Sequence, residues 1–437
     1  MTLFTDFAFP ATGAPTPRTM PDRLAEVFNV KDFGALGNNV ADDTTKIQAA
    51  MNAVLSTAGG RTPGGTLVFP AGRYKVSAPI TFNLDADFGL HVLGVGNASS
   101  VEGNHAGYTF DRSLGTPNNT FGPRVFEHLK VTNPHSSGGG IRLGSTIGGA
   151  IRGCDISADL ISLTFEDAPG SSSDSIVIDN CWFHSGVSSG TPKAIVFGGK
   201  GLVINACDIT GYDDAITVYG SGVAIYGCRM ESLNTSIVLG MDSAGADRGL
   251  HGFSITGMPM EGNVTFIDFR GTTTGFCIGS NGFTGHSGNA GLGSGVNTQY
   301  GLRLRANKAL AGEFFGLQVA SWFDVAGIYI EDYTVRANVI FNNCVSSIGG
   351  GAAIPWRVST APMGFRFIEC NIDSSVNAPS GTRYTFANLP GGGIRLEGDE
   401  YDISDASTAT LGAAASGGGA NQVRVRWDGT SWIVIGP

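Results

Sequence analysis

A short pattern recurs along this chain and limits the folds that it can form. The pattern is apolar–x–apolar–x–x–slot–x–apolar, as in "SIVIDNCWF" around Cys181 and "GLVINACDI" around Cys207. Period-two alternation places the apolar residues and the slot on one side of an extended chain, and the residues between the two alternating parts are turn formers. We interpret each copy as two short strands joined by a bend, with the apolar side facing inward.

The slot recurs at intervals of mostly 21 to 30 residues, and a longer interval of 37 before Cys344 suggests an insertion. It falls at Leu129, Cys154, Cys181, Cys207, Cys228, Met258, Asn281, Asn307, Cys344 and Cys370. Strand repeats of this length, without helices between them, predict a solenoid whose coils stack about 4.8 Å apart. We therefore predict an all-β fold, a single-stranded parallel β-helix, with the cysteines as reduced, buried packing residues. The pattern assigns no place to "GIYIEDYTV" (327–335).

The two ends of the solenoid need covers, because an open strand edge invites association. Residues 42–56, "DDTTKIQAAMNAVLS", predict an amphipathic helix that is capped by Asp42 or Asp43 and closes the N-terminal end. Residues 423–436, "VRVRWDGTSWIVIG", predict a hairpin at Asp428-Gly429 that follows an extended segment. A lone hairpin is marginally stable, so we expect Trp427 and Trp432 to pack on the same hairpin of other subunits.

Composition excludes several classes of partner. The 437 residues carry a net charge of −10 and only 15% charged side chains, which argues against binding to nucleic acid or insertion into a membrane. The seven cysteines form no metal-binding pattern, and no motif requires a cofactor. The first thirty residues lack the features of a secretory signal, so we expect folding in a cytoplasm.

One row of polar side chains follows the slot directly. Asp155, Trp182, Asp208 and Arg229 each lie one residue past it on successive coils. Two carboxylates about 9–10 Å apart around an aromatic side chain suit a sugar-cleaving site, because glycoside hydrolysis uses paired carboxylates. Two residues further lie His184 and Glu231, which would extend this surface. The alternative interpretation is a solvated face with a chance tryptophan.

A second row precedes later strands and contains Lys193 and the adjacent Asp213 and Asp214. Neighbouring like charges can raise the pKa of one carboxyl toward an acid role, with Lys193 as a possible partner. The alternative is an Asp-rich turn that caps a strand. The loop "MDSAGADRGLHG" (241–252) contributes His251 as a further candidate for substrate binding.

The stretch "VFNVKDFGALGNNVADDTTKIQAAMNAV", followed by "GGTLVFPAGRYKVS", resembles the start of pectate-lyase-like β-helix domains. With the upstream "TPRTMPDRLAEV" it is similar to phage and prophage tail spikes and tail fibres. The resemblance implies a right-handed β-helix, a homotrimer joined at the C-terminal hairpin, and binding and often cleavage of bacterial surface polysaccharide. It divides the chain into a short N-terminus that attaches to the phage tail or baseplate (1–27), a cap (28–63), the β-helix (64–405) and a C-terminal tip (406–437).

The leading hypothesis is thus a virion tail spike that folds in the host cytoplasm and depolymerises polysaccharide as a hydrolase or a lyase. Asp155, Asp208, Asp213 and Asp214 are the catalytic candidates. The substrate-binding candidates are Trp182, His184, Lys193, Arg229, Glu231 and His251. The first alternative is a receptor-binding fibre without catalytic activity. The second is a bacterial enzyme of the pectinase type.

Overall fold

Parallel strands dominate the computed structural model. It describes residues 8–9, 18–19, 27–55, 65–82, 89–112, 120–144, 146–166, 173–185, 191–279, 281–285, 297–306, 308–321, 323, 326–331, 337–347, 356–358, 365–368, 371–372, 383–384, 386 and 400–436. The chain forms two compact units, residues 1–210 and 211–437. Within the described residues, no helix is both long enough and apolar enough to span a membrane.

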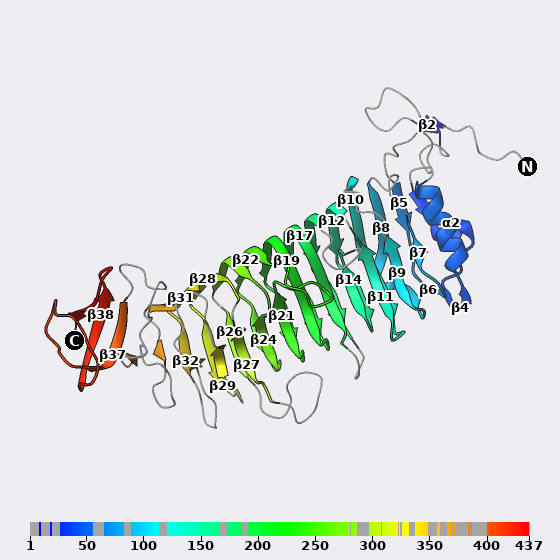
Figure 1. Ribbon diagram of the computed structural model, residues 1–437. Coiled ribbons are helices and arrows are strands. Elements are labelled where there is room, and N and C mark those ends of the chain that lie inside the picture. The colour runs from blue at the N-terminus through cyan, green and yellow to red at the C-terminus, as the bar shows by residue number, and fades with distance from the viewer. Residues whose placement is uncertain are drawn as a thin grey trace, which may run out of the picture. The chain divides into compact units, whose positions relative to one another are not determined.

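In the first unit each complete coil adds one strand to each of three parallel ladders (Figure 1). Ladder 1 contains β3 (Val27–Asn29), β5 (Gly65–Val68), β8 (Leu90–Gly103), β10 (Thr120–Asn133), β12 (Thr146–Arg152), β15 (Ser173–Asp179) and β17 (Lys193–Asn205). Ladder 2 contains β4 (Asn38–Asp42), β6 (Gly72–Val76), the ends of β8 and β10, β13 (Asp155–Ala158), β16 (Trp182–His184) and β18 (Asp208–Thr210). Ladder 3 contains β7 (Ile80–Thr81), β9 (Gly107–Arg112), β11 (Gly138–Leu143), β14 (Ile161–Thr164) and the start of β17. The predicted parallel β-helix is confirmed. A separate antiparallel pair, β1 (Ala8–Phe9) with β2 (Arg18–Thr19), precedes these ladders.

The slot lies where the sequence pattern predicts it in this unit. The register pairs Lys130 with Asp155, Asp155 with Trp182 and Trp182 with Asp208, which aligns the slot residues that precede them. The three slot cysteines of this unit are unbridged and 2–3% exposed. The second bend residue has a left-handed backbone, with φ of 51° at both Asn180 and Ala206. That conformation favours asparagine and glycine, which explains the turn formers in the pattern.

A cap covers the first coils. The 3₁₀ helix η1 (Val30–Phe33) leads to the predicted helix, which is α2 (Thr44–Leu55) and packs on β3, β5 and β7 (Figure 1). Ile47, Ala50, Met51 and Val54 are its buried face. Asp42 accepts a hydrogen bond from the Thr44 N–H at 3.0 Å. β4 lies inside the predicted cap region and β3 begins just before it, at Val27, yet both already belong to the ladders.

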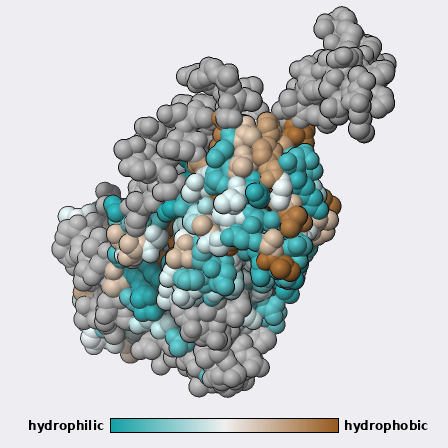
Figure 2. Space-filling view, turned by 90° about the vertical axis from the view of Figure 1, so that its right-hand side faces the viewer, coloured by the Kyte–Doolittle hydropathy of each residue, from teal (hydrophilic) through white to brown (hydrophobic). Residues whose placement is uncertain are grey.

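The outside of this end is not uniformly polar. The side chains of Val27, Leu36 and Val40 are 49%, 58% and 80% exposed. Figure 2 views the end of the molecule that carries α2 and shows several brown apolar areas among teal polar ones. The cap thus shields the core from water while keeping some apolar surface of its own.

The second unit repeats the three-ladder coil. Ladder 1 contains β19 (Asp214–Tyr226), β22 (Leu250–Thr256), β25 (Thr273–Gly279), β28 (Leu310–Phe315), β31 (Asn338–Asn342) and β34 (Phe365–Ile368). Ladder 2 contains β20 (Arg229–Glu231), β23 (Pro259–Glu261), β26 (Gly282–Gly285), β29 (Gln318–Ser321), β32 (Val345–Ser347) and β35 (Asn371–Ile372). Ladder 3 contains the start of β19, β21 (Thr235–Leu239), β24 (Thr265–Phe269), β27 (Tyr300–Leu304), β30 (Ala326–Ile330) and β33 (Trp356–Val358).

One predicted slot is wrong in this unit. Gly282 pairs with Gln318 and Gln318 with Val345, so Leu317 follows Asn281 in the slot row and precedes Cys344. The alternation around Asn307 misled the assignment, and the long interval lies before Leu317. The unplaced segment at 327–335 contributes β30, which stacks on β27. Asn307 and Cys370 themselves lie outside the described residues.

The C-terminal tip is a small sheet with its own core. β37 (Glu400–Ala406), β38 (Asn421–Trp427) and β39 (Trp432–Gly436) are antiparallel, and β36 (Arg383–Tyr384) pairs parallel to β37. The hairpin at Asp428 is confirmed, but it is not a lone hairpin. Trp427 and Trp432 are 8% and 4% exposed within one chain, so the expectation that they need other subunits is wrong. Their core partners are Ile403, Ala406, Ala415, Val423, Val425 and Val434, with Phe386 beside them.

The segment before β38 is also not extended as expected. It forms turns and bends, and Ala414 bridges to Ile433 of β39. β37, which begins at Glu400, already pairs with β38. This segment of small residues thus folds back against the C-terminal sheet.

Candidate functional site

A groove of about 370 Å³ runs across the bends that lead into ladder 2 of the first unit. Its lining residues are Asn97, His128, Gly153, Cys154, Asp155, Asn180, Cys181, Trp182, Ala206 and Asp208. These residues lie on successive coils and are far apart in the sequence. The parallel register of the coils brings them together. The stacking repeat therefore builds this groove.

Three predicted site residues meet in this groove. Asp155, Trp182 and Asp208 occupy equivalent positions on three successive coils. The side chain of Trp182 is 49% exposed, which is unusual for tryptophan and leaves a ring face open to a ligand. The predicted row of two carboxylates around an aromatic side chain is therefore present in the geometry.

Asp155 differs from the solvated carboxylate that its outward position predicts. It is 3% exposed, because Lys130 and His184 cover it. Its Oδ2 accepts a hydrogen bond from Lys130 Nζ at 2.8 Å, and its Oδ1 lies 3.1 Å from His184 Nδ1. Burial opposes the negative charge, but His184 and Lys130 outweigh it and hold the pKa of Asp155 below its usual value. Asp155 is thus an ionised carboxylate at neutral pH and not a proton donor.

His184 also lies beside Asp155, and an imidazole can both accept and donate a proton. Within the described part of the chain, neither Asp155 Oδ1 nor His184 Nδ1 has a well-directed hydrogen bond, although they lie 3.1 Å apart. The imidazole ring lies 5.3 Å from that of Trp182, centroid to centroid. A histidine oriented by a carboxylate is a common acid–base arrangement.

Sequence reasoning missed Lys130, which pairs with Asp155, and the groove-lining residues Asn97, His128 and Asn180. Lys130 follows the slot residue Leu129, so it continues the row of Asp155 one coil earlier. The same offset rule would have found it. His128 occupies the bend of that coil with φ of 53°, and only the left-handed bend and the groove lining identify it.

Lys193 does not lie in this groove. It begins β17, where it pairs with Ile161 in ladder 3, whereas Asp155 begins a strand of ladder 2. The two ladders are different sides of the coil. Lys193 therefore remains a candidate only for some other surface.

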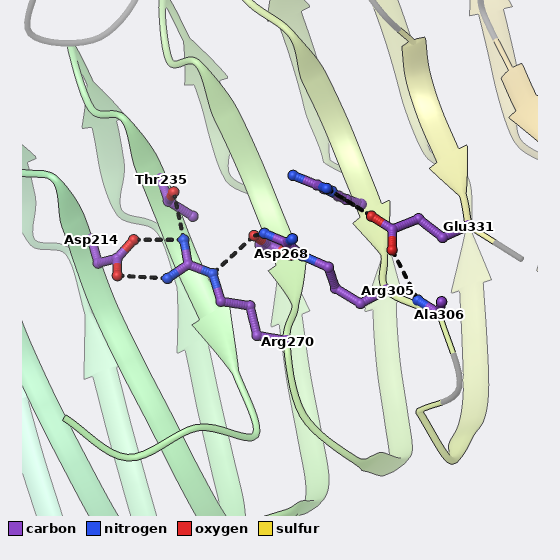
Figure 3. Close-up of polar contacts among 8 residues, drawn as sticks. Asp214, Thr235, Asp268, Arg270, Arg305, Ala306 and Glu331 are labelled. Carbon is purple, nitrogen blue, oxygen red and sulfur yellow. Dashed lines mark hydrogen bonds and ion pairs between the residues drawn. The ribbon is translucent and has the colours of Figure 1, made fainter. Parts of the chain in front are cut away.

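Asp213 and Asp214 of the second unit have separate partners. Both oxygens of Asp214 accept hydrogen bonds from Arg270, at 2.7 and 2.8 Å, and Arg270 also binds Thr235 (Figure 3). Asp213 accepts a hydrogen bond from Asn234 Nδ2 at 2.7 Å. With Asp214 held by a guanidinium, the predicted acid role of this pair is not supported by the geometry. The hypothesis overlooked Arg270, which lies 56 residues away in the sequence.

The Arg270 contacts extend into a network along ladder 3. Arg270 Nε also binds Asp268, and Arg305 binds the same carboxylate with two hydrogen bonds of 2.7 and 2.9 Å (Figure 3). Burial opposes the charge of Arg270, but Asp214 and Asp268 raise the pKa of its guanidinium above the usual value. The next pair along the ladder is Arg303 with Glu331. Each of these carboxylates is paired with an arginine, so the network joins successive coils.

The remaining candidates of the second unit do not come together. Arg229 and Glu231 lie in β20 and form a surface ion pair with 60% and 43% exposed side chains. His251 lies in β22 of ladder 1, with Nδ1 2.6 Å from Thr274 Oγ1. In the nearby loop, Arg248 and backbone N–H groups bind Asp242. Among the described residues of the chain, no three His, Cys, Asp or Glu side chains are grouped to hold a metal ion.

Comparison with known protein families identifies the family to which this chain is related. The model of the family described as "Rhamnogalacturonase A/epimerase, pectate lyase-like" matches residues 27–246, half of the chain. The chain belongs to this family. The matched stretch contains the cap, the coils of the first unit and the groove around Trp182. The resemblance to pectate-lyase-like domains is thereby confirmed.

Individual relatives match shorter stretches. Mannuronan C5-epimerase AlgE2 of Azotobacter vinelandii is 43% identical over 77 residues, which are 17% of this chain and 7% of that protein. The tail spike protein of Shigella phage Sf6 is 29% identical over 122 residues, 28% of this chain and 19% of that protein. The chain thus spans well under a quarter of the length of these relatives.

Solved structures share the fold over much more of the chain. A double mutant of the tailspike protein of E. coli bacteriophage HK620 superposes with a TM-score of 0.65 at 12% identity, covering 84% of this chain and 69% of that one. A second structure of that tailspike, solved in complex with a hexasaccharide, has a TM-score of 0.63 at 13% identity, covering 85% and 70%. At this identity the likeness concerns the β-helix fold.

Proposed function

We propose that this pectate-lyase-like protein is a subunit of a phage tail spike that binds bacterial surface polysaccharide and cleaves it in the groove around Trp182. The observation that carries the proposal is the cluster of Lys130, Asp155 and His184 beside the exposed indole of Trp182. An open aromatic face next to a proton-carrying side chain suits a sugar ring that is held and then attacked.

The side chains take distinct roles in this proposal. The indole of Trp182 stacks on a sugar ring. His184 transfers a proton at Nε2 while Asp155 orients its Nδ1–H, and Lys130 balances the charge of Asp155. Asp208, on the coil that follows the coil of Trp182 and His184, supplies the second carboxylate. Because Asp155 is held ionised, His184 or Asp208 would have to protonate a leaving group.

The comparisons support the polysaccharide and the phage role. The HK620 tailspike with which this fold superposes was solved with a hexasaccharide, and a phage tail spike is among the sequence relatives. The mannuronan epimerases are named for a polysaccharide substrate. By analogy, we propose a homotrimer in the virion tail that attaches through residues 1–27.

The test is cleavage of polysaccharide by the purified protein. Surface polysaccharides from a panel of bacteria are incubated with it, and polymer size, reducing ends and unsaturated-uronate absorbance are followed together. Shortening with reducing ends alone indicates a hydrolase. Shortening with new absorbance indicates a lyase, in which His184 acts as the base. Binding without shortening overturns the catalytic proposal and leaves a receptor-binding fibre.

A matched pair of variants locates the site. Trp182→Ala removes the proposed platform, whereas Tyr226→Ala removes another exposed aromatic side chain, 43% exposed, outside this groove. We expect Trp182→Ala alone to weaken binding. Equal loss in both variants would argue against this groove as the binding site.

A further inference from the structure

Left-handed bend residues form a row along the edge of the groove. His128, Gly153, Asn180 and Ala206 precede the slot on four successive coils, with φ of 53°, 56°, 51° and 51°. Each coil thus bends with the same backbone conformation, and the side chains of this row start from equivalent backbone positions. All four of these residues line the groove, together with the more N-terminal Asn97.

His128 occupies space that the next coil leaves open. A Cβ atom built on Gly153 would lie 2.6 Å from His128 Nδ1 and 2.9 Å from its Cε1. The imidazole therefore lies against the Gly153 backbone, between its own bend and that of the following coil. Any larger residue at 153 would push the ring away.

The polar groups at this edge face solvent. Asn97, His128 and Asn180 are exposed, and the structure records no hydrogen bond from these side chains within the described residues. Amide and imidazole groups donate and accept hydrogen bonds without adding fixed charge at neutral pH. Sugar hydroxyl and acetamido groups are matching partners. A coil spacing of about 4.8 Å lets neighbouring coils contact neighbouring sugar units.

We propose that Asn97, His128 and Asn180, which lie on different coils along this edge, form a second sugar-binding region beside Trp182, where they bind hydroxyl or acetamido groups of successive neutral sugar units. The polymer then runs along the stacking direction of the coils. His128 lies two coils before Trp182, about 9–10 Å away at the coil spacing, so it contacts a sugar unit beyond the one on the indole. This inference rests on the proposed polysaccharide binding at Trp182. Gly153 is required because it leaves room for the imidazole.

The test measures affinity against oligosaccharide length. Size-fractionated oligosaccharides, prepared by partial acid hydrolysis of a surface polysaccharide that the protein binds, are titrated calorimetrically into the full chain. We expect the wild-type affinity to rise when the fragment becomes long enough to reach from Trp182 to His128. In His128→Ala this rise should fall by about tenfold, while affinity for the shortest binding fragments stays unchanged.

Gly153→Ala tests the same contact without removing the imidazole. It should reduce the rise in affinity as His128→Ala does, since it displaces the ring. Alanine is compatible with this bend, because Ala206 adopts it. The matched control is Gly257→Ala, at a bend with φ of 67° where an added Cβ meets nothing within 4 Å, and it should leave the length dependence unchanged.

The outcomes separate this inference from the proposed function. If Trp182→Ala abolishes binding but His128→Ala and Gly153→Ala keep the wild-type length dependence, the subsite is refuted and the polysaccharide site stands. If the wild-type chain binds no polysaccharide of the panel, both proposals are refuted.

Discussion

Oδ1 of Asp155 lies 3.1 Å from Nδ1 of His184, two side chains that the repeat places on adjacent coils. This pairing changes the interpretation of the row from two symmetric carboxylates to a histidine supported by an ionised carboxylate. In the proposed mechanism, His184 is the proton carrier and Asp155 is a positioning residue.

The first prediction concerns cleavage. His184→Gln should lower kcat about 10²–10⁴-fold with a smaller change in KM, because a positioned acid or base acts mainly in the transition state. Asp155→Asn should reproduce part of that loss. Steady-state kinetics on the cleaved polysaccharide measures both, with far-UV circular dichroism as a control for folding. Wild-type kcat in His184→Gln would exclude histidine as the proton carrier.

The second prediction concerns stability and pH. The pKa of Asp155 in the folded protein lies below the usual 3.8, so its contribution to stability is present above about pH 3.8 and is lost as the pH falls through the lower folded value. Asp155→Asn should therefore cost about 1–3 kcal/mol at pH 7. Urea unfolding at several pH values checks this. A cost that is independent of pH between 7 and about 2.5 would show that the charge of Asp155 contributes nothing.

The third prediction concerns the Arg270 network. Arg270→Met leaves Asp214 without its guanidinium partner, and removal of one member of a buried ion pair costs about 3–5 kcal/mol. The side chain of Asp214 is 10% exposed and that of Arg270 28%. We expect a clear decrease in the urea midpoint. The matched control is Arg152→Met, which breaks an ion pair with Glu127 at a 48% exposed side chain and should cost less than about 1 kcal/mol. Equal losses of unfolding free energy in both variants would mean that burial of the Arg270–Asp214 pair does not increase its contribution to stability.

The fourth prediction concerns the indole platform. Trp182→Ala should raise the Kd for bound oligosaccharide about tenfold, because loss of an aromatic contact of about 1.4 kcal/mol corresponds to that factor. The unfolding free energy should change little, since the side chain is 49% exposed. Calorimetric titration and urea unfolding on the same preparation separate the two effects. A large loss of stability with unchanged affinity would make Trp182 a structural residue.

The fifth prediction concerns the C-terminal sheet. Trp432→Ala should destabilise this sheet by about 3–5 kcal/mol, because the indole fills the core between β37, β38 and β39. If the chain forms the proposed homotrimer, hydrogen exchange of the β38 amides should accelerate both at concentrations where the subunits are dissociated and where they are associated. Acceleration only in the dissociated state would restore the view that other subunits bury this side chain.

The sequence alone determined the coil and much of the groove. Period-two alternation and the repeated slot define which residues face inward, so the stacking of Cys154, Cys181 and Cys207 and the row of Asp155, Trp182 and Asp208 were predictable. Local backbone chemistry adds the bends, since asparagine and glycine tolerate their left-handed conformation. The pattern failed at Asn307, where local alternation carried no information about which coil the strand would join.

Tertiary structure decided the electrostatic partners. Arg270 reaches Asp214 across 56 residues, and Lys130 and His184 enclose Asp155, because long side chains find their partners only after the coils have stacked. Likewise, Trp427 and Trp432 are covered by β37, whose pairing with β38 no local pattern marks. A periodic pattern thus fixes which way a side chain points, and only the folded chain decides what it meets there.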